Sequence, residues 1–153
     1  MATLLEEFTA LTGEFNRLAI DYAVCGGWAM SIHGLPRATI DIDLMIRSAD
    51  LEKAWTIARQ LGYDVEGLPL HFDLVEIRRI SKIDQETKNL LTIDFLLVTK
   101  GLETIWNERQ LIEWENGGIW TVSRKGLIEL KTLAGRAQDL VDIEKLSEEM
   151  DES

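Results

Sequence analysis

Cysteine is nearly absent from the sequence, because Cys25 is the only one in 153 residues. A single thiol excludes an intrachain disulfide and fits a protein of a reducing compartment. The chain also lacks an apolar run of the roughly 20 residues that a membrane-spanning helix needs. Residues 1–8 are acidic and periodic, whereas a secretory signal would be basic and then continuously apolar. We therefore expect a cytoplasmic protein that does not interact with a membrane.

Positive charge is also scarce, since 16 Lys and Arg residues face 27 Asp and Glu residues and leave a net charge of −11. Non-specific affinity for nucleic acid depends on Lys and Arg neutralising phosphates, so this balance argues against general DNA binding. Much of the acidic excess lies in residues 144–152. Four cations that flank one expected strand turn could meet an RNA acceptor or form a solvated hairpin end: Arg78, Arg79, Lys82 and Lys88.

The spacing of apolar residues predicts a mixed α/β (α+β) fold, in which a mixed sheet is flanked by helices and followed by a small helical C-terminal part. We expect one domain over 1–153, with a core over about 1–100 and a hairpin with C-terminal helices over about 101–153. Helices are expected over about 4–19, 28–33, 51–61, 124–134 and 137–150. Strands are expected over about 22–25, 40–46, 70–80, 89–98, 111–114 and 119–122, with a hairpin turn at 116–118.

Acidic residues interrupt two of these expected strands. Asp41 and Asp43 alternate with apolar residues and therefore point to the same face, and Asp94 lies in a strand that is otherwise apolar throughout. Carboxylates ~5 Å apart repel by roughly 3 kcal/mol at an effective dielectric of ~20, so three converging acids require a cation. Hard oxygen ligands favour Mg²⁺ or Mn²⁺. The alternatives are an exposed edge strand for Asp41 and Asp43, and an ion pair with Arg78 or Arg79 for Asp94.

Two glycines follow the first expected strand. Gly26 and Gly27 allow the backbone to turn sharply and approach a ligand where a Cβ atom would collide. Backbone N–H groups at such a turn and at the start of the next helix form an anion site. A plain strand-to-helix turn is the alternative for the dipeptide alone, and the acids on the next strand make the phosphate-binding interpretation more specific.

A strand, Gly-Gly, a helix, Asp-x-Asp on the next strand and a third Asp on a later strand resemble the polymerase β type nucleotidyltransferase superfamily. Residues 26–34 and 37–44 are most similar to small bacterial proteins related to the AbiEii toxins and to minimal nucleotidyltransferases. Residues 131–136 and 138–143 resemble the AbiEii-like helices that carry a phosphate-contacting lysine and a supporting aspartate. The resemblance covers roughly residues 20 to 146, although 100–123 carry no recognised motif.

The resemblance implies a metal-dependent nucleotidyltransferase that moves a nucleoside monophosphate from an NTP to a hydroxyl acceptor and releases pyrophosphate. The acceptor would be RNA, a protein side chain or a small molecule, and two Mg²⁺ or Mn²⁺ ions are expected. Asp41, Asp43 and Asp94 would be the catalytic metal ligands. Nucleotide-binding roles would fall to Gly26, Gly27, Arg37, Thr39, Lys131 and Asp139.

Several of these roles have simpler alternatives. Arg37 and Thr39 could be loop surface, Lys131 a solvated lysine, and Asp139 a helix cap. The resemblance also implies a toxin–antitoxin context, in which the chain would have a cognate toxin or antitoxin partner. A catalytically weak, nucleotide-binding antitoxin or regulatory protein is therefore the alternative function, and a purely structural protein is a third.

Overall fold

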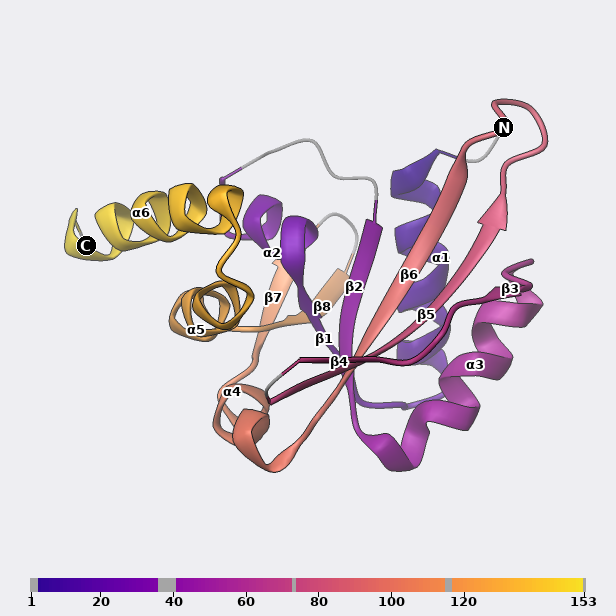
Figure 1. Cartoon of the computed structure of the whole chain (residues 1–153), viewed down its shortest axis with the longest axis horizontal. Coiled ribbons are helices and arrows are strands. Elements are labelled where there is room, and N and C mark those ends of the chain that lie inside the picture. The colour runs from indigo at the N-terminus through magenta and orange to yellow at the C-terminus, as the bar shows by residue number, and fades with distance from the viewer. Residues whose placement is uncertain (1–2, 36–40, 73, 115–116, 153) are drawn as a thin grey trace.

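A computed structural model describes residues 3–35, 41–72, 74–114 and 117–152 of the chain (Figure 1). Its helices are α1 (Leu4–Arg17), α2 (Gly26–Ile32), α3 (Leu51–Gln60), α4 (Glu103–Asn107), α5 (Arg124–Ala134) and α6 (Ala137–Glu152), with short 3-10 helices η1 (Ser48–Asp50) and η2 (Lys100–Leu102). Its strands are β1 (Ala23–Cys25), β2 (Asp41–Ile46), β3 (Val65–Glu66), β4 (Leu70–Phe72), β5 (Val75–Ile83), β6 (Leu90–Leu97), β7 (Gln110–Trp114) and β8 (Gly117–Thr121).

The described strands form one mixed sheet in the order β3-β5-β6-β2-β1-β8-β7, with β4 paired to β5. Strand β2 runs parallel to β6, and β1 runs parallel to β8, while the other neighbours are antiparallel. The strands that carry the acids, β2 and β6, are therefore central and adjacent. Such a mixed α/β sheet flanked by helices is the predicted fold class.

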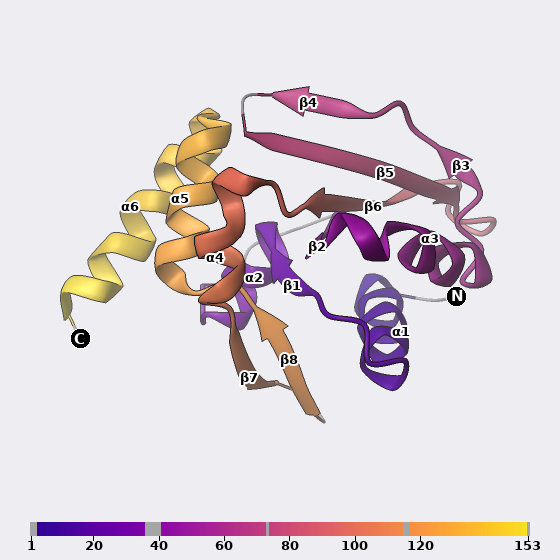
Figure 2. The same cartoon turned by 90° about the horizontal axis from the view of Figure 1, so that it is seen from below.

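Helices α1 and α3 cover one face of the sheet, as Figure 2 shows. The Thr3 side chain caps α1 by accepting a hydrogen bond from the backbone N–H of Glu6 at 3.1 Å, as the Thr-x-x-Glu pattern predicts. One stripe of α1 then buries Phe8, Leu11 and Phe15 completely. These side chains and the buried stripe of α3 form the main core beneath the central strands.

The C-terminal helices lie at the other end of the molecule, next to α2. Ser123 caps α5 through the N–H of Gly126, and Gly135 ends it in the left-handed conformation at φ +65°. The His33 ring, at the end of α2, contacts the Val122 carbonyl oxygen at 2.8 Å, which ties α2 to the chain just before α5. Helix α6 packs on α5 and extends outward (Figure 1).

Two local predictions were wrong, and two short helices were not predicted. The strand expected over 70–80 is two strands, β4 and β5, which pair antiparallel with Phe72 opposite Val75. Gly117 and Gly118, which were expected in the hairpin turn, belong to β8, and β8 pairs antiparallel with β7 as expected. The short helices η2 and α4 were not expected, because η2 and the five-residue α4 are too short to show apolar periodicity. No helix in the described ranges has both the length and the apolarity to cross a bilayer.

Candidate active site

The strand register brings two of the predicted catalytic acids together. Asp43 on β2 is the direct partner of Asp94 on β6, and neighbouring strands lie about 4.8 Å apart. Phe95, the next residue along β6, packs against Phe15 and Trp55 on the face covered by α1 and α3. Since successive side chains alternate, Asp94 and its neighbour Asp43 point to the opposite face.

Asp41 shares that face because it precedes Asp43 by two residues on the same strand. The intervening Ile42 is buried in the core at 1% exposure, as the alternation predicts. An exposed edge strand, the alternative for this pair, is wrong, because β2 lies between β6 and β1. The predicted metal acids therefore lie on one face of two central strands.

Gly26 approaches the Asp43 carboxylate more closely than any other residue type would allow. Its φ is +65°, and a Cβ atom placed there would lie 2.1 Å from Asp43 Oδ2. Gly27 is buried in the first turn of α2. The glycine turn and the acids therefore form one continuous site, as a phosphate-binding turn beside metal ligands requires.

The acids disfavour each other's charge. Burial, followed by the charges of Asp94 and Asp41, raises the pKa of Asp43 from 3.8 to about 7. Burial and the charge of Asp94 also raise the pKa of Asp41. Burial and the charges of Asp43 and Asp94 raise the pKa of the Cys25 thiol well above its ordinary value, so this buried cysteine is neutral. A cation at this face would relieve the repulsion.

Asp94 has a protein counterion in this structure. Arg79 on β5 is its direct cross-strand partner and donates hydrogen bonds to both carboxylate oxygens, at 2.7 and 2.9 Å. The ion pair with Arg79, proposed above as the alternative for Asp94, is therefore present. The pair raises the pKa of Arg79. Asp94 itself is 5% exposed, so Arg79 compensates an otherwise buried charge.

The carboxylate oxygens of Asp41, Asp43 and Asp94 suit a hard divalent cation, although Asp94 is already engaged by Arg79. Carboxylate oxygens are the ligands that Mg²⁺ and Mn²⁺ prefer, and burial together with the neighbouring acids raises the pKa values of Asp41 and Asp43. Within the described part of the chain, however, no three His, Cys, Asp or Glu side chains are gathered closely enough to hold an ion. Asp94 would have to share its carboxylate with Arg79 or release it to complete such a set.

Lys131 on α5 reaches the same region, but it is not solvated. Its side chain is 6% exposed, and its Nζ donates to Asp142 Oδ2 at 2.9 Å and lies 3.6 Å from Asp139 Oδ1. The solvated-lysine alternative is therefore wrong. Because two acids of α6 compensate it, Lys131 joins α5 to α6 as well as lining the site.

Asp139 is a helix cap at the start of α6, which was the alternative interpretation of its sequence position, and it also contacts Lys131. Its Oδ2 accepts from the backbone N–H of Arg136 at 3.1 Å and from Arg136 Nε at 2.7 Å. Burial alone would raise the pKa of Asp139, but the hydrogen bonds from Arg136 lower it below its ordinary value. The charge of Arg136 also opposes part of the increase in the pKa values of Asp41 and Asp43. Arg136 is thus a cation of the site that the sequence analysis did not select.

A cavity of about 460 Å³ connects these groups. Its polar lining includes Asp43, Asp94, Arg79, Lys131 and Arg136, and Asp139 and Gly26 also border it. Aliphatic side chains from β4–β6 and α5 form the remaining wall, namely Leu70, Val75, Ile77, Leu96, Leu127, Leu130 and Ala134. This size suits a small-molecule ligand.

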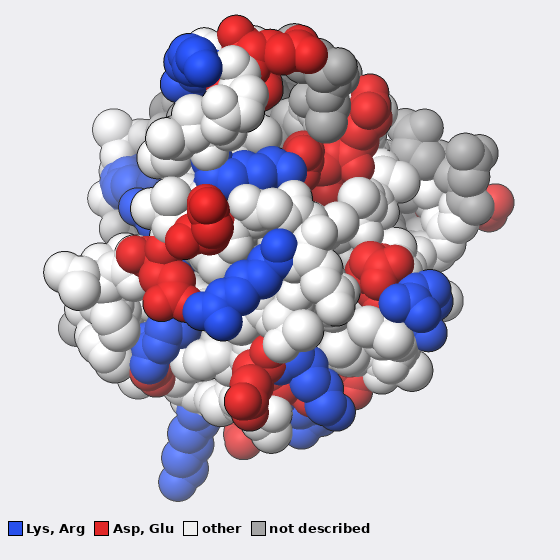
Figure 3. Space-filling model, turned by 90° about the vertical axis from the view of Figure 1, so that its right-hand side faces the viewer, with Lys and Arg blue, Asp and Glu red and all other residues white. Residues whose placement is uncertain are grey.

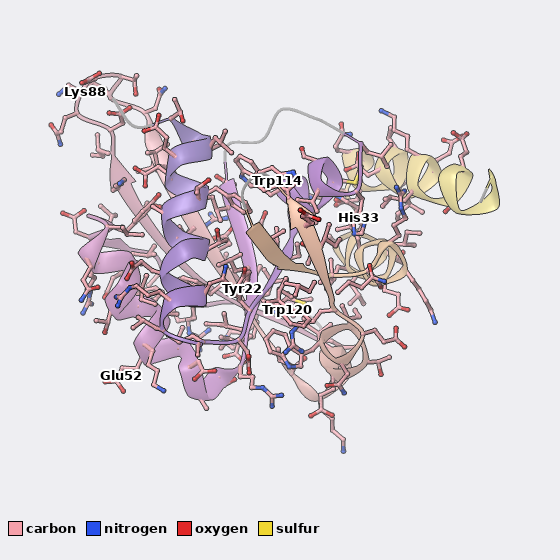
Figure 4. All side chains as sticks on the ribbon, turned by 180° about the vertical axis from the view of Figure 1, so that it is seen from behind. Tyr22, His33, Glu52, Lys88, Trp114 and Trp120 are labelled. Atoms are coloured by element: carbon pink, nitrogen blue, oxygen red, sulfur yellow. The ribbon has the colours of Figure 1, made fainter. Side chains whose placement is uncertain are left out.

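Other residues considered from the sequence lie elsewhere. Arg37 and Thr39 fall outside the described residues. Trp28 does not face the cavity: it stacks on Phe8 with ring centroids 4.3 Å apart and is a core residue. Figure 4 places His33 and Trp114 near α2 and Lys88 at the far tip of the β5–β6 hairpin.

The cations near that hairpin are largely neutralised. Arg78 donates to Glu76 at 2.6 Å, and Lys82 lies 2.7 Å from Glu7, in addition to the Arg79–Asp94 pair. Figure 3 shows acidic and basic side chains interspersed on one face of the molecule, without a broad basic area. The described residues of this hairpin therefore do not form a basic patch for RNA.

The fold has counterparts among solved structures. A Thermotoga maritima protein provisionally assigned as a nucleotidyltransferase superimposes with a TM-score of 0.66 at 12% identity, over 97% of this chain and 93% of that one. The chain has a nucleotidyltransferase fold.

Two antibiotic-modifying enzymes share it. The lincosamide adenylyltransferase LnuA, solved with lincomycin, has a TM-score of 0.61 at 16% identity, over 95% of this chain and 97% of that one. ANT(2″)-Ia, solved with adenylyl-2″-tobramycin, has a TM-score of 0.63 at 13% identity, over 92% and 86%. No family model and no curated protein matches the sequence, so the likeness is one of fold.

Proposed function

We propose that the protein is a metal-dependent nucleotidyltransferase, which moves a nucleoside monophosphate from an NTP to a hydroxyl acceptor with release of pyrophosphate. One observation carries the proposal: Asp43 is paired with Asp94 in the sheet, lies against Gly26, and opens into a cavity of about 460 Å³. The nucleotidyltransferase fold supports it. Two neighbours of that fold are named for adenylyl transfer or solved with an adenylylated product.

Asp41, Asp43 and Asp94 would hold one or two Mg²⁺ or Mn²⁺ ions. When bound, such ions lower the pKa of an acceptor hydroxyl and offset the charge of a triphosphate. The raised pKa values of Asp41 and Asp43 support this assignment, because a bound cation would favour their charged forms.

The chain's own groups position the substrates and balance charge. Gly26, which has no Cβ, lets the backbone of the turn lie directly beside the Asp43 carboxylate, and Gly27 follows it in the same turn. Arg136 contributes positive charge at the cavity, and Lys131 with Asp139 fixes α6 so that Arg136 is held there. Arg79 is the counterion of Asp94 before a metal binds. Catalysis would consist mainly of positioning and charge neutralisation.

Roles for Arg37 and Thr39 in phosphate binding remain predictions of the family resemblance, as do the AbiEii-like relationship, a toxin or antitoxin partner and a cytoplasmic location. The proposal does not depend on any of them.

Transfer can be tested with α-³²P-labelled NTPs, Mg²⁺ or Mn²⁺, and a panel of RNA, protein and small hydroxyl acceptors. We expect label on an acceptor with the wild-type chain and none with Asp41→Asn or Asp43→Asn. Asp64→Asn is the matched control, because Asp64 is exposed and lies outside the cavity lining. Transfer that persists in the double variant Asp41→Asn, Asp43→Asn would refute the proposal. Metal-dependent NTP binding without transfer would favour the regulatory alternative.

A further inference from the structure

Side chains on the cavity face of the sheet form two parallel rows. Directly paired residues in adjacent strands share a face, so the ladder β5–β6–β2–β1 aligns Arg79, Asp94, Asp43 and Cys25 in one polar row. Two positions farther along the strands, the same ladder with β4 aligns Leu70, Ile77, Leu96 and Met45. An aliphatic row therefore runs beside the acids on the same face of the sheet.

Helix α5 supplies the opposite wall. Leu127, Leu130, Lys131 and Ala134 recur at i, i+3, i+4 and i+7, which places them on one face of the helix, and all four line the cavity. Leu127 and Leu130 are 1% and 9% exposed, so this wall is apolar apart from the paired lysine. The aliphatic row and the apolar residues of α5 together border a slot, and the charged lining lies beside it, at the acids of the sheet and at Lys131, Arg136 and Asp139.

The position of the slot indicates which substrate it would bind. In the sheet order, Gly26 follows β1 on one flank of the acids, whereas β5 and β4 lie on the other flank, beyond Asp94. If the triphosphate lies at Gly26, in-line displacement requires the attacking hydroxyl to approach from the side opposite the leaving pyrophosphate. The flank formed by β4–β6 is then the acceptor side.

The lining indicates what kind of acceptor fits. None of the described residues around the cavity is aromatic, so a nucleobase finds no ring on which to stack. The cations of the slot are already engaged by Asp94, Asp139 and Asp142, so they offer little to an RNA backbone. The slot is part of a cavity of about 460 Å³ that also borders Gly26 and Asp43, so it excludes a folded macromolecule and suits a small molecule.

We propose that the acceptor is a small hydroxyl compound with a mainly aliphatic body, seated between the β4–β6 row and α5 with its hydroxyl beside Asp94. This inference rests on the proposed nucleotidyl transfer and adds the class and the location of the acceptor. Leu70 and Ile77 are its specificity-determining residues, because they provide the part of the row that is farthest from the glycine turn.

The test uses 4-cyclohexyl-1-butanol as probe, with binding followed by calorimetry in the absence of nucleotide. We expect Leu70→Gln to weaken probe binding about tenfold, since a polar amide replaces a buried contact. Leu68→Gln is the matched control two residues away, because Leu68 is 84% exposed and does not line the cavity. Ile77→Thr, which retains β-branching in the strand, should weaken the probe in the same direction if Leu70→Gln is unstable.

A competition experiment separates the acceptor from the nucleoside. Saturating α,β-methylene-ATP with Mg²⁺ should leave the affinity for the probe within about twofold, because the two ligands occupy different sites. Full displacement of the probe would assign the slot to the nucleoside and overturn the inference. Equal probe binding by Leu70→Gln and Leu68→Gln would overturn it as well, as would transfer of label to a tRNA mixture but to no small alcohol.

The proposed function fails in a different way. In that case the wild-type chain shows no Mg²⁺-dependent binding of the ATP analogue and still binds the probe more tightly than Leu70→Gln does. That result would refute nucleotidyl transfer and leave the aliphatic site in place.

Discussion

Replacing Gly26 with alanine tests the close approach between the glycine turn and Asp43. The new Cβ would lie 2.1 Å from Asp43 Oδ2 and 2.8 Å from Cγ, so the carboxylate must move. Left-handed backbone at φ +65° adds about 1–2 kcal/mol for a residue that has a Cβ. Forcing a buried side chain out of its position adds roughly 1–3 kcal/mol. We therefore expect Gly26→Ala to lower the free energy of unfolding by about 2–5 kcal/mol.

Gly135 is a matched control within the same chain. Its φ is also +65°, but the atom nearest to an added Cβ is the Thr132 carbonyl oxygen at 3.8 Å, an ordinary contact. Gly135→Ala should therefore show the backbone cost alone, about 1–2 kcal/mol. The difference between the two alanine variants measures the collision with Asp43.

Urea denaturation of both variants would provide the free energies, and thermal melts should show about 2–4 °C per kcal/mol for a chain of this size. In an Asp43→Ala background the colliding carboxylate is absent and only the Cβ of residue 43 remains, 3.0 Å from the added Cβ, so most of the excess cost over Gly135→Ala should disappear. We expect a coupling of at least about 1 kcal/mol between Gly26 and Asp43. Equal losses for the two glycines, or an excess that survives undiminished without Asp43, would refute the close approach.

Three further results are expected. Asp43 keeps its proton up to about pH 7 in the folded chain but loses it near 3.8 when unfolded, so stability should fall as pH rises from about 4 to 7. The difference corresponds to at most about 4 kcal/mol, and Asp43→Asn should flatten this slope in denaturation series across pH. Lys131→Met should lower the free energy of unfolding by about 3–5 kcal/mol, because buried Asp142 loses this cation while Asp139 retains Arg136. Urea denaturation measures the loss, and Asp142→Leu in the same chain should restore part of it; an unchanged midpoint would contradict the network. Arg79→Gln leaves Asp94 uncompensated, so Mg²⁺ should raise the melting temperature of this variant more than that of the wild-type chain; equal shifts would argue against a metal at Asp94.

The sequence was most informative where acidic residues interrupt an otherwise apolar, periodic strand. Alternation around Ile42 placed Asp41 and Asp43 on one face, and the register of β2 with β6 put Asp94 beside them. The helix cap at Thr3 and the helical stripes were likewise local signals, which persist in the folded chain because tertiary packing agrees with them.

The cavity itself could not be predicted in this way. The reversal between β4 and β5 has no glycine or proline to mark it, so residues 70–80 looked like one strand and Leu70 seemed remote from Ile77. Arg136 was missed because its position depends on the left-handed turn at Gly135 and on the Asp139 cap, and together these direct a loop residue into the site. The meeting of these residues at one cavity depends on contacts between distant segments, and the spacing of apolar residues along the sequence does not encode such contacts.

The pairing of β1 with β8 bears on how the protein is made. Val24 is hydrogen-bonded in register with Thr121, nearly a hundred residues later, and α5 follows directly after that strand. A ribosome adds residues in order, so strands β2 and β6 are synthesised well before helix α5, which lines the cavity on the side opposite the sheet. Until α5 emerges, the aliphatic row Leu70–Ile77–Leu96 has no partner on that face. The nascent chain therefore has to keep this surface from other chains during the last part of its synthesis, and a chain stopped before residue 124 should aggregate where the full chain remains monodisperse.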